Sequence, residues 1–299
     1  MKVLIIGCGY VGLPLGEELA RLGHTVVGAR RSTEGLEEVR QAGLEPIAFD
    51  VTSEEEWLAL PTDFDWVVNT VSSSKGGADQ YTRVYLQGNR NLIQWAARSA
   101  VKKIVYTSST SVYAQSDGAE VDEASATEPT SPTSRVLVEA EKVLLEAGRT
   151  GIAPAVVVRV AGIYGPGRGH LFQNYVKGEA VIPDDGSRLS NMVHRDDVAG
   201  AIIAALERGQ PGEVYNAVDQ EPVALIDFFG WLSRELGRPM PPQVPSDQLP
   251  ERKRGATSKR VSHRKMVEVL GYQLKYPTFR EGYREPVDAV RAQESVRVP

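Results

Sequence analysis

The sequence predicts an α/β fold in which a doubly wound parallel sheet is joined to a smaller C-terminal lobe. Short apolar runs alternate with amphipathic helical patterns from residue 2 to residue 217, as expected when helices return the chain between parallel strands. A glycine-rich turn joins the first run to the first helix. Beyond residue 165 the alternation loosens and turn residues become frequent, so a less regular unit is expected there.

The first predicted strand, residues 2–6, is the continuous apolar run KVLII, which is typical of a strand covered on both faces. Residues 11–22 carry apolar positions at helical spacing, and Gly23 closes this helix before a second strand at 26–28. The alternation then continues with helix 33–42, strand 45–49, helix 54–60, strand 66–71, helix 79–99, strand 103–107, helix 134–147 and strand 155–160.

The last third of the chain is interrupted by turns. The run GPGRG at residues 165–169 is a turn, after which helix 196–207 and strand 213–217 are expected. Five prolines between Pro239 and Pro250 predict an extended crossing rather than a helix. We therefore assign residues 1–164, with returning segments at about 189–221, to the main domain. About 165–188 and 222–299 form the smaller lobe, at the carboxyl edge of the sheet.

Composition excludes several classes of protein. The chain has 299 residues, 41% hydrophobic and 24% charged, with a formal net charge of −5 and dispersed cations, so disorder and a nucleic-acid partner are not expected. Cys8 is the one cysteine, which excludes an intrachain disulfide and a cysteine-based metal site. No run reaches the roughly 20 apolar residues of a membrane span. We expect a cytoplasmic protein with a small-molecule substrate and no metal.

The first turn carries a dinucleotide-binding pattern. Gly7, Gly9 and Gly12 match G-x-G-x-x-G, placed after a strand and at the start of a helix. The three glycines permit a tight turn, close approach of a pyrophosphate and close packing of helix on strand. Tyr10 and Val11 complete this candidate cofactor contact. The pattern favours a Rossmann-type dinucleotide-binding domain over a purely structural turn.

The end of the second strand predicts which dinucleotide is bound. An acidic residue there would bind the ribose 2′-hydroxyl of NAD(H), but Arg30, Arg31 and Ser32 stand in its place. Two guanidiniums and a hydroxyl suit the 2′-phosphate of NADP(H), although two solvated arginines would give the same pattern. Asp50 and Val51 could flank the adenine, and Asp50 could equally cap a helix. NADP(H) is the predicted cofactor, and NAD(H) the less favoured one.

Three further segments resemble the extended branch of the short-chain dehydrogenase/reductase superfamily, the NAD-dependent epimerase/dehydratase-like proteins. They are YTSSTSVY at residues 106–113, RVAGIYGPG at 159–167 and MVHRDDVA at 192–199. The resemblance covers nearly the whole chain. It implies that Ser109 is the catalytic hydroxyl, that the smaller lobe binds substrate, and that two long helices pair in a homodimer.

The chain departs from that family at its acid–base pair. The resemblance places Thr133 where the family has tyrosine and Leu137 where it has lysine, so this chain resembles an atypical subgroup that lacks Tyr-x-x-x-Lys. Threonine is a far weaker acid than a phenol, so Tyr113 or Tyr164 could supply a substitute phenol at the carboxyl edge of the sheet. The candidate catalytic residues are Ser109, Thr133 and Tyr113. Tyr85, in the place of a family asparagine, is a further phenol, although each tyrosine could instead be a packing residue.

The candidate substrate contacts are Tyr164, Arg188 and His194. The basic runs 251–254 and 258–260 either form a solvated loop or direct one or two of their arginines, together with Arg188, into the cleft to hold an anionic substrate such as a nucleotide diphosphate. Two functions remain open. One is an NADP(H)-dependent epimerase/dehydratase-like or reductase-like enzyme acting on a small anionic or sugar-nucleotide-like substrate with a non-standard active site. The other is a catalytically inactive NADP(H)-binding sensor or regulatory protein.

Overall fold

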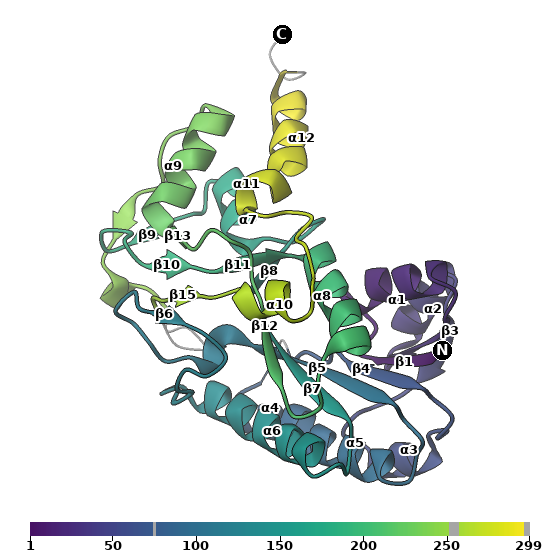
Figure 1. Ribbon diagram of the computed structural model, residues 1–299. Helices are drawn as coiled ribbons and strands as arrows, with labels where there is room; N and C mark the ends of the chain where they lie inside the picture. The colour runs from purple at the N-terminus through teal and green to yellow at the C-terminus, as the bar shows by residue number, and fades with distance from the viewer. Residues whose placement is uncertain (74–75, 251–256, 296–299) are drawn as a thin grey trace.

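The computed structural model describes residues 1–73, 76–250 and 257–295. Its centre is a seven-stranded sheet in the order β12-β7-β5-β4-β1-β2-β3, with every neighbouring pair parallel (Figure 1). The strands are β1 (Lys2–Ile6), β2 (Thr25–Arg30), β3 (Glu45–Ala48), β4 (Trp66–Asn69), β5 (Lys103–Ser109), β7 (Ala155–Val160) and β12 (Val214–Ala217). The predicted fold class is confirmed.

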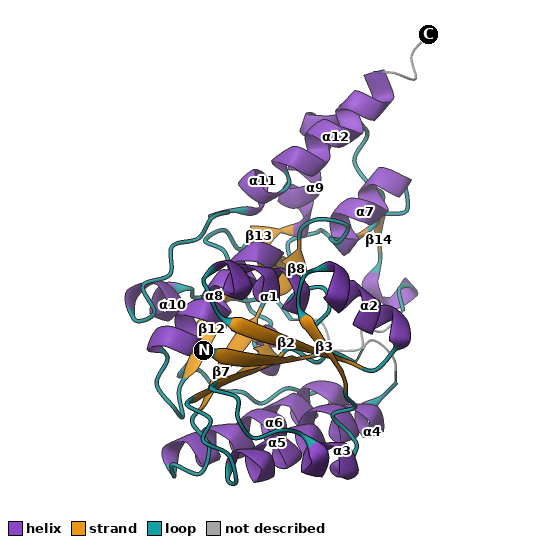
Figure 2. Cartoon of the chain, turned by 90° about the vertical axis from the view of Figure 1, so that its right-hand side faces the viewer, coloured by secondary structure: helices purple, strands orange, loops and turns teal. Residues whose placement is uncertain are grey.

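Helices cover both faces of this sheet, as Figure 2 shows with the sheet nearly edge-on. On one face lie α1 (Gly12–Arg21), α2 (Thr33–Gln41) and α8 (Arg195–Arg208), and on the other α3 (Glu54–Ala59), α4 (Ala78–Tyr81), α5 (Gly88–Ala96) and α6 (Pro132–Arg149). All six residues of β7 are buried, which explains why the strands read as continuous apolar runs rather than as alternating ones.

Local capping sets where several helices begin. Ser32, Ser53 and Ser131 precede α2, α3 and α6, and each side-chain oxygen accepts a hydrogen bond from the backbone N–H three residues later. Pro132 then occupies the first turn of α6, where its missing N–H costs nothing. These serines define helix starts that the apolar periodicity locates only to within a few residues.

The single helix expected at 79–99 is instead interrupted. A π-helical segment, η1 (Thr82–Gln87), separates α4 from α5. Apolar periodicity predicts that this stretch is helical, but it does not distinguish α-helical from π-helical hydrogen bonding. The segment carries Tyr85, which lies buried at the carboxyl edge of the sheet.

The rest of the chain forms short paired strands and helices that lie beyond the carboxyl edge of the sheet (Figure 1). The strand pairs are β8 (Gly162–Tyr164) with β11 (Met192–His194), β10 (Leu189–Ser190) with β13 (Val223–Ala224), β9 (Ile182–Pro183) with β14 (Gln243–Val244), and β6 (Glu120–Val121) with β15 (Arg260–Val261). The helices are α7 (His170–Lys177), α9 (Leu225–Leu236), α10 (Arg264–Glu268), α11 (Phe279–Gly282) and α12 (Arg284–Ser295), with 3₁₀ turns η2 (Thr110–Val112) and η3 (Ser246–Gln248).

This part has its own aromatic core. Phe228, Trp231, Phe279 and Tyr283 pack against one another between α9, α11 and α12. The proline-rich segment at 239–250 contains only β14 and η3, in agreement with the expected extended crossing. Within the described ranges, no helix has the length and hydropathy needed to cross a bilayer.

Candidate cofactor and substrate site

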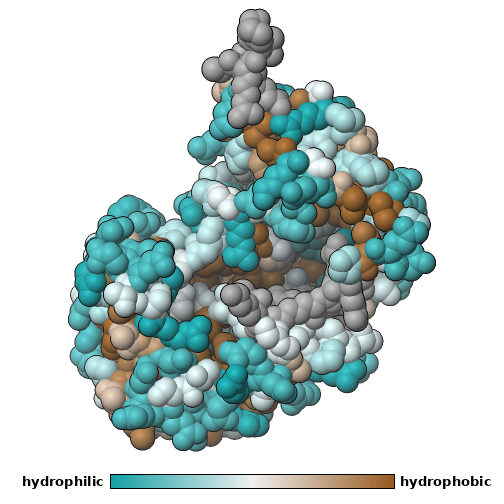
Figure 3. Space-filling model, turned by 180° about the vertical axis from the view of Figure 1, so that it is seen from behind, coloured by the Kyte–Doolittle hydropathy of each residue, from teal (hydrophilic) through white to brown (hydrophobic). Residues whose placement is uncertain are grey.

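Two cavities open where the order of the strands reverses, between β1 and β4. The β2 cavity, of about 770 Å³, lies over the ends of β1 and β2, and the β5 cavity, of about 430 Å³, lies over the ends of β4, β5 and β7. Both are lined by Gly7, Gly9, Tyr10, Val71 and Ser72. Figure 3 shows a hollow between the two halves of the molecule, with hydrophobic residues on its floor. Ligands of open parallel sheets bind at such a reversal point.

The glycine turn forms the cradle between the cavities. Gly7 has φ +80°, and a Cβ there would lie 2.8 Å from the backbone of Val71. A Cβ at Gly12 would lie 3.0 Å from the side chain of Ile5. No side chain caps the N-terminus of α1. The N–H of Leu13 is bonded to the Gly9 carbonyl and Pro14 has none, so an anion at this helix end would bind to the N–H groups before Leu13. A turn that leaves no room for a Cβ at Gly7 or Gly12 and leads into a helix without a side-chain cap fits a dinucleotide pyrophosphate.

The β2 cavity holds the two predicted arginines. Nη1 of Arg30 donates to the Cys8 carbonyl at 2.9 Å, and its Nη2 lies 3.2 Å from a carboxylate oxygen of Glu38. Arg31 is more exposed and lies 3.6 Å from Asp50. Both arginines line the β2 cavity, as expected for ligands of a phosphate. Glu38 lines it too, and its carboxylate would compete with that phosphate for Arg30.

The other predicted cofactor residues divide between the cavity wall and its support. Val51 lines the β2 cavity beside Phe49, as expected for a wall against an adenine. Ser32 caps α2, and Asp50 accepts hydrogen bonds from the N–H and hydroxyl of Thr52. Ser32 and Asp50 do not line either cavity, and their observed contacts are those of capping and turn residues.

Ser109 lies at the end of β5 and lines the β5 cavity. Its side-chain oxygen accepts a hydrogen bond of 3.2 Å from the N–H of Ser111, so Ser109 caps the start of η2. Ser108 lines the same cavity, and its buried hydroxyl has no hydrogen-bond partner among the described residues. Buried polar groups without a partner are rare, so the Ser108 hydroxyl can take a hydrogen-bond partner from the cavity that it lines.

The substituted acid–base pair is split by the structure. Leu137 lines the β5 cavity from α6, whereas Thr133 is buried one turn earlier, 3.5 Å from the hydroxyl of Ser131, and does not line it. Tyr85 also lines the cavity, and its hydroxyl accepts a hydrogen bond from the N–H of Ser73 at 2.8 Å. The wall that resembles the family's catalytic face is therefore apolar at Leu137 and phenolic at Tyr85.

Tyr113 is not brought to the cavity. It is fully buried, and its hydroxyl donates to Asn216 at 2.9 Å and accepts from Arg159 at 2.8 Å. Burial raises its pKa to about 12. Arg159 is in turn paired with Glu141 of α6. The motif that resembles the family places Tyr113 near the end of β5. In the structure its side chain points into the protein interior, where it joins the hydrogen-bond network of Asn216 and Arg159.

Two of the three expected substrate contacts are also buried in the fold. Tyr164 stacks on Tyr283 with ring centroids 4.4 Å apart, and its hydroxyl donates to the Thr278 carbonyl. His194 caps α8 by accepting from the N–H of Asp196, and burial lowers its pKa to about 4. Neither residue lines the β5 cavity, whereas Arg188 does.

Two cations in the β5 cavity were not among the expected site residues. Arg168 lines it and lies over the ring of Tyr10, 5.0 Å from its centroid. Lys259 lines it although its side chain is almost fully buried, while the neighbouring Arg260 is exposed. The signal for Lys259 was the alternation of residues 259–261, since Lys259 and the buried Val261 share one face of an extended segment. The basic run 251–254 lies outside the described residues.

The lining of the β5 cavity is basic. Among described residues it contains Arg168, Arg188 and Lys259 and no aspartate or glutamate. Over the described ranges, no group of three His, Cys, Asp or Glu side chains could hold a metal ion. The cavity therefore combines hydroxyls and cations, which suits an oxygen-rich anionic ligand.

Known proteins resemble this chain over nearly its whole length. The model of the NAD dependent epimerase/dehydratase family matches residues 3–217. Protein YeeZ of Escherichia coli is 30% identical over 283 residues, covering 92% of this chain and 96% of that protein. The 3-diazoavenalumate denitrifying reductase of a Streptomyces species is 23% identical, with 94% and 99% covered.

A solved structure shows the same fold. The dTDP-glucose 4,6-dehydratase DesIV of Streptomyces venezuelae, solved with NAD bound, superposes with a TM-score of 0.83 at 22% identity and covers 100% of this chain and 99% of its own. At that identity the similarity concerns the fold alone.

Proposed function

Because the chain belongs to the NAD-dependent epimerase/dehydratase family, we propose that it binds NADP(H) and acts on a small anionic or sugar-nucleotide-like substrate with a non-standard active site. The observation that carries the proposal is the pair of cavities joined at the glycine turn, one basic at the end of β2 and the other lined by hydroxyls and cations. A dinucleotide spans two such cavities, and a substrate meets its reactive end in the second.

The preference for NADP(H) is supported by the chemistry of the β2 cavity. Arg30 and Arg31 line it, and the end of β2 carries no acid. Glu38 shares Arg30 in the described arrangement. A 2′-phosphate would compete with that carboxylate for the guanidinium, and a doubly charged phosphate is the stronger acceptor. The glycine turn would hold the pyrophosphate, and Phe49 and Val51 would border the adenine.

The β5 cavity would supply the chemistry. The bound cofactor accepts or donates hydride, and the protein positions the substrate and holds its oxygen. Ser109 is the hydroxyl that would polarise a carbonyl or hold a hydroxyl at the end of β5. Arg168 and Arg188 would hold an anionic group of the substrate. Tyr85, which stands in the place of a family asparagine, and Tyr10 are the phenols in the lining of this cavity.

The second candidate function is an NADP(H)-binding sensor without turnover. The presence of Leu137 in the cavity wall favours it, because leucine offers no charge to lower the pKa of a neighbouring hydroxyl. A sensor would bind oxidised and reduced cofactor with different conformations or partner affinities. Identical behaviour with both redox forms would contradict this function.

The first experiment is a fluorescence titration of the protein with NADPH, followed by competition with NADP, NADH and NAD. We expect NADPH and NADP to bind more tightly than the NAD pair, and Arg30→Ala to weaken the phosphorylated pair selectively. Arg40→Ala is the matched control, since Arg40 lies on the exposed side of α2 and pairs with Glu37. If Arg30→Ala bound each of the four nucleotides with the same affinity as wild type does, the proposed contact between Arg30 and the 2′-phosphate would be refuted.

Turnover separates the two candidates. With carbonyl and sugar-nucleotide substrates as the screen, an enzyme should lose rate in Ser109→Ala while retaining NADPH binding. A rate unaffected by that substitution would exclude Ser109 from the mechanism.

A further inference from the structure

Lys259 is held rigidly at the wall of the β5 cavity. Its segment is clamped from two sides, because Ser258 exchanges backbone hydrogen bonds with Gln115 and Gly118, and the side chain of Asn191 bonds to the backbone of Lys259 and Val261. The position of the backbone therefore does not depend on a ligand, and it directs the lysine side chain inward.

The ammonium of Lys259 is buried and donates hydrogen bonds to uncharged groups. The residue is 3% exposed. Its Nζ donates to the Tyr113 carbonyl at 2.9 Å and to the Thr257 hydroxyl at 2.7 Å. Within the described part of the chain, no carboxylate pairs with it. These two bonds leave one of the three ammonium N–H donors for the cavity that the residue lines.

Among the described residues that line the cavity, no carboxylate compensates this charge either. The titratable or charged groups that line the cavity with Lys259 are Tyr10 from the glycine turn, Tyr85 from η1, Arg168 from the loop after β8, and Arg188 from the turn before β10. Cations and neutral phenols cannot neutralise an ammonium. A buried cation in such surroundings is costly unless an anion joins it.

We propose that Lys259 is the charged hydrogen-bond donor for an anionic oxygen of the substrate, a carboxylate or a phosphate, and that a proton binds to it together with that anion. The ammonium thus enters the cavity from the segment before β15, and not from α6, where Leu137 stands. The inference rests on the proposed function only in taking the β5 cavity as the substrate site.

The proton balance follows from the surroundings of the amine. Burial lowers the pKa of Lys259 to about 8, so near pH 8 a substantial fraction of the amine is neutral. A bound anion favours the charged form and raises the pKa. Anion binding near pH 8 should therefore take up a fraction of a proton from the solvent, and the affinity should fall as the pH rises above 8.

The experiment is isothermal titration calorimetry at pH 8 in two buffers of different ionisation enthalpy. Malonate and inorganic pyrophosphate are the probes, because they distinguish a carboxylate from a phosphate ligand, and each is titrated with and without saturating NADPH. We expect the wild type to take up protons with at least one probe. Lys259→Arg, which stays charged, should bind without proton uptake, and Lys259→Met should bind roughly 10- to 100-fold more weakly.

Arg260→Gln is the matched control, since Arg260 is the adjacent cation but is exposed and donates to the Gly118 carbonyl outside the cavity. Wild-type affinity in Lys259→Met, equal apparent binding enthalpies of wild type in both buffers, or no binding of either anion would each overturn the inference. If Lys259→Met does not fold, the inference is tested by comparing the proton uptake of wild type with that of Lys259→Arg. Equal proton uptake in the two proteins would overturn it. If wild type did not bind NADPH but its anion binding still depended on Lys259, the cofactor proposal would be overturned and this inference would stand.

Discussion

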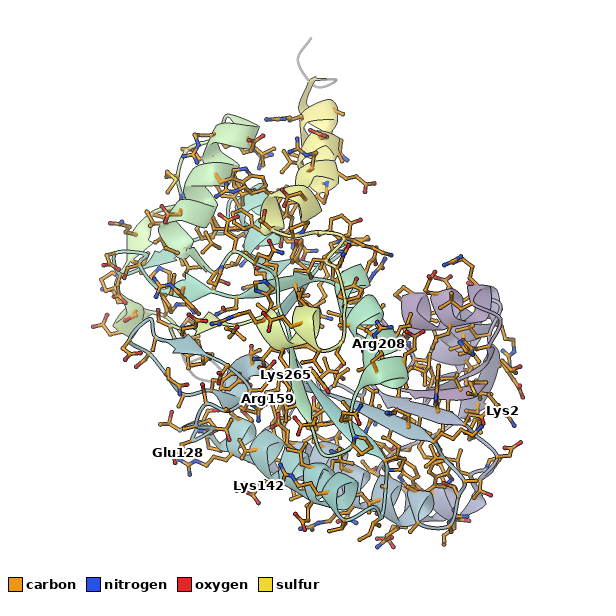
Figure 4. The ribbon with its side chains drawn as sticks, viewed as in Figure 1. Lys2, Glu128, Lys142, Arg159, Arg208 and Lys265 are labelled. Atoms are coloured by element: carbon orange, nitrogen blue, oxygen red, sulfur yellow. The ribbon has the colours of Figure 1, made fainter. Side chains whose placement is uncertain are left out.

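Replacement of Glu141 by alanine tests the buried network behind the candidate site. Glu141 of α6 accepts three hydrogen bonds from Arg159 of β7, at 2.8 to 3.2 Å, and the two side chains are 2% and 6% exposed. In Figure 4, Arg159 lies in the interior of the molecule, whereas Lys142 lies on the outer side of α6. Arg159 is also paired across the sheet with Ser108, so the network supports the strand end that carries Ser109.

The magnitude follows from what the alanine leaves behind. Arg159 would keep one hydrogen bond to the Tyr113 hydroxyl but would lose its only carboxylate among the described residues. Removal of one partner from a buried ion pair costs about 3–5 kcal/mol. With an unfolding entropy of about 2.1 cal/mol/K per residue, this lowers Tm by roughly 5–8 °C for a chain of 299 residues that unfolds as one unit.

Urea unfolding followed by circular dichroism measures the change, with calorimetry for Tm. Glu139→Ala is the matched control, because Glu139 lies on the same helix but is exposed and paired with Lys142. We expect this control to cost less than about 0.5 kcal/mol. If the free energies of unfolding of the two variants differed by less than about 1 kcal/mol, the stabilising role assigned to the buried pair would be refuted.

Three further substitutions probe the cavities and the pH response. Glu38→Gln removes the carboxylate that competes for Arg30 and should tighten NADPH binding by about two- to fivefold, without tightening NADH, in a fluorescence titration. Gly7→Ala, whose Cβ would lie 2.8 Å from the backbone of Val71 at a φ of +80°, should weaken NADPH binding by more than about tenfold; wild-type affinity would show that the turn is not the cradle. Burial lowers the pKa of His194 to about 4, so as the pH falls the unfolded chain binds a proton at this histidine before the folded protein does. The free energy of unfolding should therefore fall on the order of 2–3 kcal/mol from about pH 6.5 to 4. His194→Asn, which keeps a capping acceptor, should abolish this part of the pH dependence in urea unfolding, and an unchanged slope would assign it to other groups.

The parts of the fold that follow from local pattern were predicted well. The strand and helix at the glycine turn agree with the structure to within one residue at each end, because burial on both faces and helical periodicity are encoded in neighbouring residues. The π-helical segment around Tyr85 was not predicted, since apolar periodicity indicates a helix without distinguishing α-helical from π-helical hydrogen bonding.

The candidate site was predicted more unevenly. Arg30, Arg31 and Ser109 line the cavities as expected, because each directly follows or ends a strand of the sheet, where topology alone places it at the carboxyl edge. Tyr113 and Tyr164 lie in the interior instead. A residue in a loop or short strand can face either a cavity or a core, and the neighbours that decide are distant in sequence, such as Arg159 for Tyr113.

The sequence by itself determined the doubly wound sheet, its glycine turn and the absence of an acid after the second strand, since all three are properties of short contiguous segments. Only the tertiary structure decided which cations meet the hydroxyls of β5. Lys259 and Ser109 are 150 positions apart in the chain, and they line one cavity because Asn191 and the segment around Gly118 hold β15 against the carboxyl edge of the sheet. Contacts of that range depend on how the whole chain packs, and no local periodicity encodes them.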